Sequence, residues 1–280
     1  MADKALVLGG GGLTGIAWET GILAGLAEHG VDLTDADLVV GTSAGSVVGV
    51  DVRAGKPLAE LFEAQSAPMA ATEIYAKMGR SVMLRYAMAV TFTRKPLVAG
   101  RRIGKLALRS KTETEAERRR IFETRMSALE WPVGDLKITA VETLSGEFIV
   151  FDANSGVSLI DAVGASCAVP GIWPPVTIMG KRYMDGGMRS ATNADLAAGY
   201  ERVVIIAPLH QGFGPIASVA SQVGQLERQG SHVLVIKPDD AALEAIGKNV
   251  LDPGHRPAAA AAGYAQAAAE VAAVAAIWNG

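Results

Sequence analysis

The first 55 residues repeat one pattern. A short apolar run, at residues 6–8 and again at 38–40, ends in a glycine-containing turn, and a helix-like stretch follows. Successive strand–turn–helix units of this kind set their strands parallel and cover the sheet with helices. The pattern therefore predicts an α/β fold, a three-layer α/β/α arrangement with a mostly parallel central sheet.

Size and composition fit a single domain over residues 1–280. Half of the residues are hydrophobic, the formal net charge is −3, and there is one cysteine, Cys167. This composition excludes a mainly disordered chain and a protein that binds nucleic acid through overall basicity. The lone cysteine excludes a disulfide scaffold. The His, Cys and carboxylate residues do not cluster at ligand spacing, so we expect no metal.

The two ends of the chain bear on localisation. Residues 1–8 lack the basic region, long apolar run and cleavage site of a signal peptide. The tail, residues 258–278, is mostly alanine and contains Tyr264, Gln266 and Glu270. Alanine favours helix but inserts weakly into membranes, which predicts a packed C-terminal helix rather than a membrane span. We therefore expect a cytoplasmic protein.

The segment at about 66–130 has a different character from the rest. Residues 66–110 are rich in methionine, and residues 74–112 contain no acidic residue. The methionines and basic residues are Met69, Met78, Met83, Met88, Lys77, Arg80, Arg85, Arg94, Lys95, Arg101, Arg102, Lys105, Arg109 and Lys111. Apolar side chains interleaved with arginine suit a cap over the active site or a patch peripheral to the membrane. The alternative is a solvated helical face whose methionines belong to the core.

Secondary structure beyond this point continues the α/β pattern. A charge-rich helix is predicted at 112–129, with a capping box at Thr112–Glu115. Residues 136–151 predict a hairpin, and 158–168 a helix. Two short strands bracket the turn at Met179 and Gly180, and buried strands follow at 203–206 and 232–236.

The pentapeptide Gly41-Thr-Ser-Ala-Gly45 is the strongest local signal. A G-x-S-x-G turn between a strand and a helix is typical of a nucleophile elbow, in which a sharp turn projects the serine hydroxyl outward. The glycines leave room for neighbouring elements, and the following helix directs its N-terminal dipole toward a developing oxyanion. The motif predicts Ser43 as a nucleophile; an ordinary turn with a capping serine is the alternative.

The glycine loop at residues 10–15 allows two interpretations. Its sequence matches G-x-G-x-x-G after a strand, which is typical of dinucleotide folds. Such folds need an acidic residue at the end of the second strand, and here that strand ends in the serine turn. Consecutive glycines can instead aim several backbone N–H groups at one point, as an oxyanion hole requires. The second use is favoured, so we expect no cofactor.

A serine nucleophile needs a base, and two candidates remain. Asp185-Gly186-Gly187 ends a predicted strand, although Asp-Gly is also a common turn. Of the four histidines, only His210 follows a strand on the expected active face. The order Ser43, Asp185, His210 matches that of an α/β-hydrolase triad, but the elbow comes unusually early in the chain.

Taken together, the motifs make the chain resemble the patatin-like phospholipase family. The glycine loop at 10–15, the elbow at 41–45 and the Asp-Gly-Gly turn at 185–187 match its three signatures in order. The stretch at 165–171 (Ala-Ser-Cys-Ala-Val-Pro-Gly) also resembles the family. The similarity extends from about residue 4 to about residue 210.

This resemblance implies a serine lipid acyl hydrolase that acts on lipid or other acyl esters. It implies Ser43 as nucleophile and Asp185 as its partner in a dyad, without a cofactor. It also implies an oxyanion hole formed by the amides of Gly10, Gly11 and Gly12, within motifs completed by Gly15, Gly41, Gly45, Gly186 and Gly187. One departure is Thr14, where the family often has Arg or Lys. The alternative is a non-lipid esterase or acyltransferase with a Ser43–Asp185–His210 triad.

Overall fold

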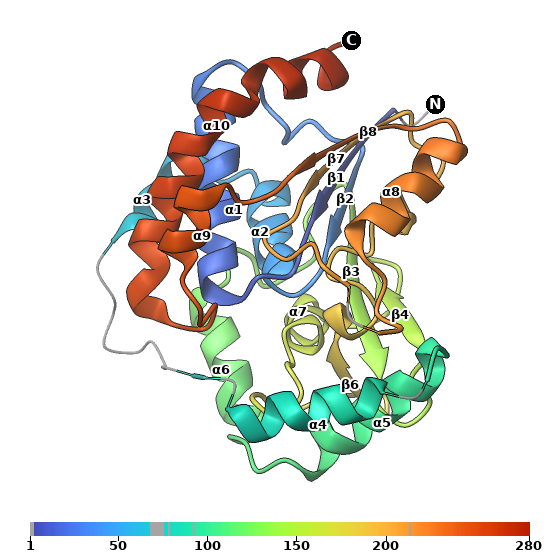
Figure 1. Ribbon diagram of the computed structural model, residues 1–280. Helices are drawn as coiled ribbons and strands as arrows, with labels where there is room; N and C mark the ends of the chain where they lie inside the picture. Colours follow the sequence, from blue (N-terminus) through green and yellow to red (C-terminus); the bar gives the residue numbers. More distant parts are fainter. Residues whose placement is uncertain (1–2, 68–75, 78, 92, 213) are drawn as a thin grey trace.

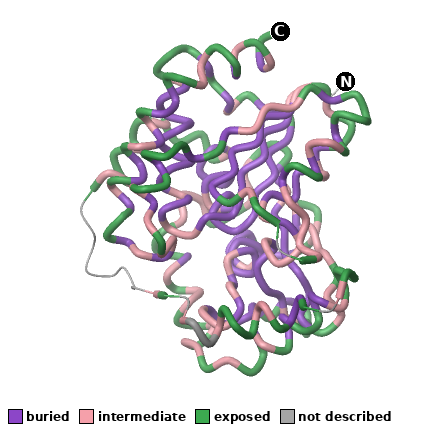
Figure 2. The backbone as a smooth tube through the Cα atoms, in the orientation of Figure 1, coloured by how far each residue is buried: buried purple, intermediate pink, exposed green. Residues whose placement is uncertain are grey.

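The first strands carry apolar residues on both of their faces. In the computed structural model, which describes residues 3–67, 76–77, 79–91, 93–212 and 214–280, Leu6 and Leu8 pack into one hydrophobic cluster, whereas Ala5 and Val7 pack into another on the opposite face. Successive side chains of a strand point to opposite faces, so both faces of this sheet are covered. Figure 2 shows the buried backbone concentrated in these central strands.

The sheet has eight strands in the order β5-β6-β3-β2-β1-β7-β8, with β4 pairing with β3. Strands β3, β2, β1, β7 and β8 are parallel neighbours, whereas β4, β5 and β6 are antiparallel additions. Their bounds are β1 (Lys4–Leu8), β2 (Leu38–Gly41), β3 (Asp135–Glu142), β4 (Phe148–Phe151), β5 (Val176–Ile178), β6 (Lys181–Asp185), β7 (Arg202–Ile206) and β8 (His232–Ile236). The predicted mostly parallel sheet and both hairpins are confirmed.

Helices cover both faces of the sheet (Figure 1). One face carries α1 (Gly12–Glu28), α2 (Ala44–Arg53), α7 (Leu159–Ser166) and α10 (Arg256–Trp278). The other carries α4 (Arg80–Val90), α5 (Pro96–Arg109), α8 (Val219–Arg228) and the short turn η2 (Ala194–Ala197). The remaining helices are α3 (Leu58–Ser66), α6 (Glu115–Arg125), α9 (Asp240–Ile246), η1 (Gly186–Met188) and η3 (Pro253–His255). The three-layer α/β/α arrangement is confirmed.

The C-terminal helix packs lengthwise against α1. A Cβ on Gly21 would lie 2.2 Å from the carbonyl oxygen of Ala260, and one on Gly263 would lie 2.3 Å from that of Trp18. Trp18 Nε1 also donates to the buried Gln266 side chain. By length and composition alone, Pro253–Trp278 is the one helix of the described chain that could also cross a membrane. Small residues therefore let α10 pack closely on α1, as the sequence predicted.

The segment rich in methionine and arginine contains α4, α5 and α6. Met69, Tyr75, Met78 and Phe92 lie outside the described residues. Met83 and Met88 on α4 are each 57% exposed, so the interpretation of these methionines as core residues is wrong for both. The helix predicted at 112–129 is α6, and its capping box is formed by Thr114 and Glu117 rather than at Thr112–Glu115. The cap role of this segment stays a prediction.

Candidate active site

Ser43 occupies a strained turn between β2 and α2. Its φ of 53° and ψ of −116° lie outside the regions that non-glycine residues usually adopt. The flanking glycines explain how the turn fits. A Cβ on Gly45 would lie 2.1 Å from the Leu8 carbonyl oxygen, and one on Gly41 would lie 2.6 Å from Ser46 Cα. The predicted elbow is thus present, and its glycines are required by close backbone approach.

The strand pairing brings Asp185 to Ser43. Ala140 of β3 pairs with Ile149 of β4 and with Asp185 of β6, so β4 and β6 lie on opposite edges of β3. Ile138 of β3 pairs with both β4 and β2, so β2 also lies opposite β4 and shares one edge of β3 with β6. Because β2 runs parallel to β3 and β6 antiparallel, the two strands meet with their C-terminal ends facing each other. Ser43 follows one end and Asp185 forms the other.

A direct hydrogen bond joins these two side chains. Ser43 Oγ donates to Asp185 Oδ2 at 2.7 Å across 142 positions of sequence. The second carboxylate oxygen, Oδ1, accepts from the Gly187 N–H at 2.7 Å. Asp185 is only 3% exposed, and this burial raises its pKa to about 6 against the lowering effect of both hydrogen bonds. The carboxylate is thus a stronger base than usual and is still mostly ionised at neutral pH.

Asn193 ties the elbow to the Asp-Gly-Gly turn. Its fully buried Nδ2 lies 3.1 Å from Thr42 Oγ1, 3.2 Å from Thr139 Oγ1 and 3.3 Å from the Gly186 carbonyl oxygen. Thr139 stands on β3 between the facing ends of β2 and β6, and its hydroxyl also contacts that of Thr42. Asn193 itself has φ of 50°, which asparagine tolerates better than most residues. Sequence reasoning missed this residue, since no spacing or motif marks it.

Ser166 and Cys167 hold the backbone of the elbow. The Ser43 N–H donates to Ser166 Oγ at 2.9 Å, and Cys167 Sγ donates to the Ser43 carbonyl oxygen at 3.3 Å. Burial, followed by the nearby Asp185 charge, raises the pKa of Cys167 to about 12. The cysteine therefore stays a thiol and is no second nucleophile. Two residues of the stretch at 165–171 therefore fix the position of the elbow backbone.

The glycine loop lies beside the serine, where a Cβ on Gly10 would be 3.5 Å from Ser43 Cβ. The Gly10 N–H, however, donates to the Ala191 carbonyl oxygen at 2.7 Å. The amides of Gly11 and Gly12 have no hydrogen-bond partner within the described residues. Gly12 begins α1 with φ of +62°, and a Cβ there would meet the Val250 carbonyl oxygen at 2.5 Å. Two free donors thus stand at a helix N-terminus.

Two neighbours shape the loop, and neither was expected from the sequence. The Gly9 N–H donates to Glu19 Oε1 at 2.8 Å, and burial raises the pKa of this glutamate well above its usual value. Burial therefore disfavours the charged form of this glutamate beneath the loop. Thr14, which stands where the family often has a cation, is buried and bonds through its N–H to the Val250 carbonyl oxygen. The loop itself therefore brings no positive side chain to the site.

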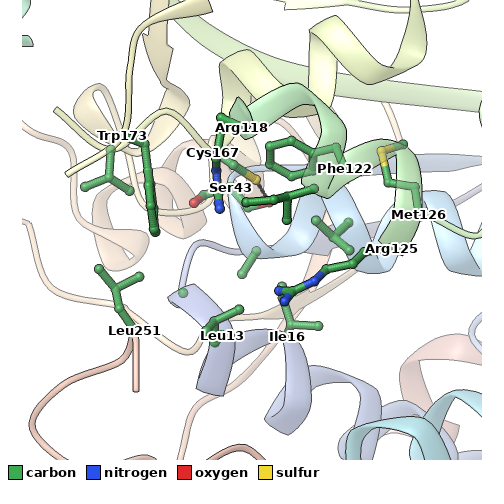
Figure 3. Close-up of a pocket in the computed structure, with 15 residues that line it drawn as sticks. Leu13, Ile16, Ser43, Arg118, Phe122, Arg125, Met126, Cys167, Trp173 and Leu251 are labelled. Atoms are coloured by element: carbon green, nitrogen blue, oxygen red, sulfur yellow. Dashed lines mark hydrogen bonds between the residues drawn. The ribbon is translucent and has the colours of Figure 1, made fainter. Parts of the chain in front are cut away.

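Ser43 opens into a mostly apolar pocket between α1 and α6 (Figure 3). The apolar side chains come from the start of α1, from α2, from one face of α6 and from the loop after α7. The lining residues are Gly12, Leu13, Ile16, Ser43, Ala44, Val47, Arg118, Ile121, Phe122, Arg125, Met126, Cys167, Val169, Trp173 and Leu251. A pocket of this kind suits an acyl chain at its apolar walls and an ester at Ser43.

His210 makes no hydrogen bond to Ser43 or Asp185 among the described residues. It is absent from the residues that line the pocket, and its Nδ1 is buried without a hydrogen-bond partner in the described chain. Both oxygens of Asp185 are engaged by Ser43 and Gly187. The geometry therefore gives no support to the alternative triad. Across the described ranges, no group of three or more His, Cys, Asp or Glu side chains is placed to hold a metal ion.

Comparison with known proteins identifies the family of the chain. The family model described as "Patatin-like phospholipase" matches residues 6–198, which is well over half of the chain. Among solved structures, VipD from Legionella pneumophila superposes with a TM-score of 0.48 at 12% identity, covering 98% of this chain and 67% of its own. The type III effector ExoU gives 0.45 at 17% identity, covering 98% and 53%. The match over residues 6–198 shows that the chain belongs to the patatin-like phospholipase family.

Proposed function

We propose that the protein is a serine lipid acyl hydrolase in which Ser43 and Asp185 form a catalytic dyad. Membership of the patatin-like phospholipase family implies lipid acyl hydrolase activity. The observation that carries the assignment of residues is the 2.7 Å hydrogen bond from Ser43 Oγ to a buried carboxylate. A nucleophile within hydrogen-bonding reach of a base is the arrangement that acyl transfer through a covalent intermediate needs.

The two half-reactions use the same pair. As Ser43 Oγ attacks the acyl carbonyl carbon, its proton passes to Asp185 Oδ2. The tetrahedral intermediate collapses, the ester C–O bond breaks, and the leaving alcohol takes the proton from Asp185. Water then attacks the acyl-enzyme while Asp185 accepts its proton, and Ser43 leaves as the alcohol. The raised pKa of Asp185 brings its basicity closer to the working pH, which favours both proton transfers.

We assign the amides of Gly11 and Gly12 as the hydrogen-bond donors to the oxyanion of the tetrahedral intermediate. Their N–H groups lack partners among the described residues, and they lie at the positive end of the dipole of α1. The N–H of Gly10 already donates to the Ala191 carbonyl oxygen. Gly10 therefore contributes to the site through its small size beside Ser43. A single donor of this type typically contributes about 10²- to 10³-fold in rate.

Contact with a membrane surface is proposed for α4 and α5. Leu84, Met83 and Met88 on α4 are each more than half exposed, and Leu97 on α5 is 52% exposed. The exposed basic side chains of residues 85–109, a stretch without an acid, are Arg85, Arg94, Lys95, Arg101, Arg102, Lys105 and Arg109. Apolar side chains within a cationic surface suit an anionic lipid interface. Tyr86 also donates to the Pro170 carbonyl oxygen, which places this surface beside the loop that lines the pocket.

The test is covalent labelling with a fluorophosphonate, followed by peptide mapping. We expect the label on Ser43, and we expect Ser43→Ala to lose both labelling and about 10⁴-fold or more of turnover. His210→Ala serves as the control and should keep both. Labelling of another residue, or full loss of turnover in a folded His210→Ala protein, would overturn the dyad. Product analysis with phospholipid vesicles and added alcohol separates hydrolysis from acyl transfer, which share the acyl-enzyme.

A further inference from the structure

The α6 helix turns one face toward the nucleophile. Arg118, Ile121, Phe122, Arg125 and Met126 line the pocket that contains Ser43, and their spacing places them on one side of a helix. This face brings positive charge into walls that are otherwise mostly apolar. The glycine loop contributes no cation, since Thr14 is buried and uncharged. Among the described residues that line the pocket, the cationic side chains are therefore those of α6.

In the described part of the chain, Arg118 is held by aromatic rings rather than by an ion pair. Its guanidinium carbon lies 3.8 Å from the centre of the Trp173 ring and 4.9 Å from that of Phe122. Stacking on two aromatic faces fixes the plane of the guanidinium and leaves its N–H groups free to bond. Its Nε is buried without a hydrogen-bond partner among the described residues, and no carboxylate lines the pocket there. Figure 3 shows Arg118, Trp173 and Ser43 around the same opening.

The next arginine on the same helix shows the contrast. Arg119 forms ion pairs with Glu123 and with Asp161 of α7, and it lies outside the pocket of Ser43. Its charge is already balanced by the protein. No ion pair is formed by Arg118 among the described residues; burial lowers its pKa, which the nearby charge of Glu113 only partly opposes. A half-buried cation with unused donors is the arrangement expected for a ligand that supplies the anion.

We propose that Arg118 is a specificity-determining residue that binds an anionic group, such as a phosphodiester, next to the scissile ester. The inference rests on the proposed hydrolase function and deepens it. A planar guanidinium can take two phosphate oxygens at once, and its position in the pocket of Ser43 sets the anion close to the ester. The enzyme then prefers acyl esters that carry such a group over neutral esters with the same acyl chains.

The test compares two soluble short-chain substrates below their aggregation limit, dibutanoyl phosphatidylglycerol and dibutanoylglycerol. Monomeric substrates remove the contribution of any membrane contact. We expect Arg118→Gln to lower kcat/KM for the phosphate ester about 10- to 100-fold and to leave the neutral ester within about threefold. Arg118→Lys should recover part of the loss, since it keeps the charge but not the paired geometry. Arg120→Gln, at an exposed arginine of the same helix, is the matched control and should change neither value.

Equal loss on both substrates, or a wild-type enzyme without preference, would overturn the role of Arg118. These outcomes leave the hydrolase itself intact, because the neutral ester still reports turnover at Ser43. Absence of turnover on both esters and of fluorophosphonate labelling would instead remove the proposed function. Inorganic phosphate distinguishes the source of the anion: if it competes with the neutral ester as strongly as the phosphate ester does, the site serves a free anion and the specificity proposal fails.

Discussion

The polar residues around Ser43 and those on the α6 face of the pocket differ in whether the protein supplies their hydrogen-bond partners. Asp185 and Asn193 are buried, and their hydrogen bonds run to the elbow, to β3 and to the Asp-Gly-Gly turn. Arg118 is stacked on rings and has unused donors. The contrast indicates which part of the site the fold completes by itself and which part a substrate must complete.

After Ser43→Ala, the largest effect is expected at Asp185, the proposed base. Asp185→Asn keeps the shape of the side chain but cannot accept the proton from Ser43, so turnover should fall by about 10³-fold or more. In the wild type, kcat/KM should rise with pH around a midpoint of about 6, because the carboxylate must be ionised to act. Measuring kcat/KM of the wild type and of Asp185→Asn against pH, with a soluble ester as substrate, tests both the loss of turnover and the midpoint. A midpoint near the ordinary value of about 4 would mean that burial does not tune this base.

Asp185→Asn should lower turnover but raise the free energy of unfolding. The folded protein holds the Asp185 proton more tightly than the unfolded chain, since its pKa is about 6 rather than 3.8. The free energy of unfolding therefore falls as the pH rises through this range, and the lower value persists above it. At about pH 8, Asp185→Asn should raise the free energy of unfolding by about 1 to 3 kcal/mol, a gain that disappears near pH 4. Denaturant titration at both values tests it.

A second prediction concerns the backbone beneath the dyad. Gly45→Ala would place a methyl group 2.1 Å from the Leu8 carbonyl oxygen, so we expect a loss of about 3 kcal/mol or more in the free energy of unfolding. Gly224→Ala in α8 is the matched control, because its Cβ would meet only the end of the Arg228 side chain at 3.3 Å. The control should gain about 0.5 to 1 kcal/mol from helix propensity. Similar thermal shifts for both variants would contradict the close packing of the elbow.

The smallest effect is expected at the outer surface of α4. Replacing Leu84 and Met88 by serine removes exposed apolar area without touching the core, so stability should stay within about 0.5 kcal/mol. Binding to anionic vesicles in a sedimentation assay should fall about three- to tenfold, because each buried apolar group contributes modestly to interfacial binding. Hydrolysis of a soluble ester should not change. Unchanged sedimentation of the double variant would show that this surface does not meet the membrane.

The sequence predicted the elements whose signals are local. Two strand–turn–helix units, the elbow at Ser43 and the Asp-Gly-Gly turn follow from spacing and glycine, and the structure contains them. Asn193 acts through a side chain that only the folded chain brings to the elbow, so no local pattern reveals it. Ser166 lies in the stretch at 165–171 that resembles the family, but its contact with the elbow also appears only in the folded chain. The occupied amide of Gly10 and the unpaired Arg118 likewise depend on neighbours from distant parts of the chain.

The head-to-head arrangement of β2 and β6 along one edge of β3 has a consequence for how the sequence can change. The separation of the reacting pair is set by three short strands and their registers. Helices α3 to α6 lie in the chain between β2 and β3, outside this pairing. Changes in that stretch that preserve the packing of α4 and α5 on β3 and β6 can alter its surface chemistry while the proposed reaction centre keeps its geometry. Substrate choice and catalytic power can therefore evolve, or be engineered, as separable properties of one chain.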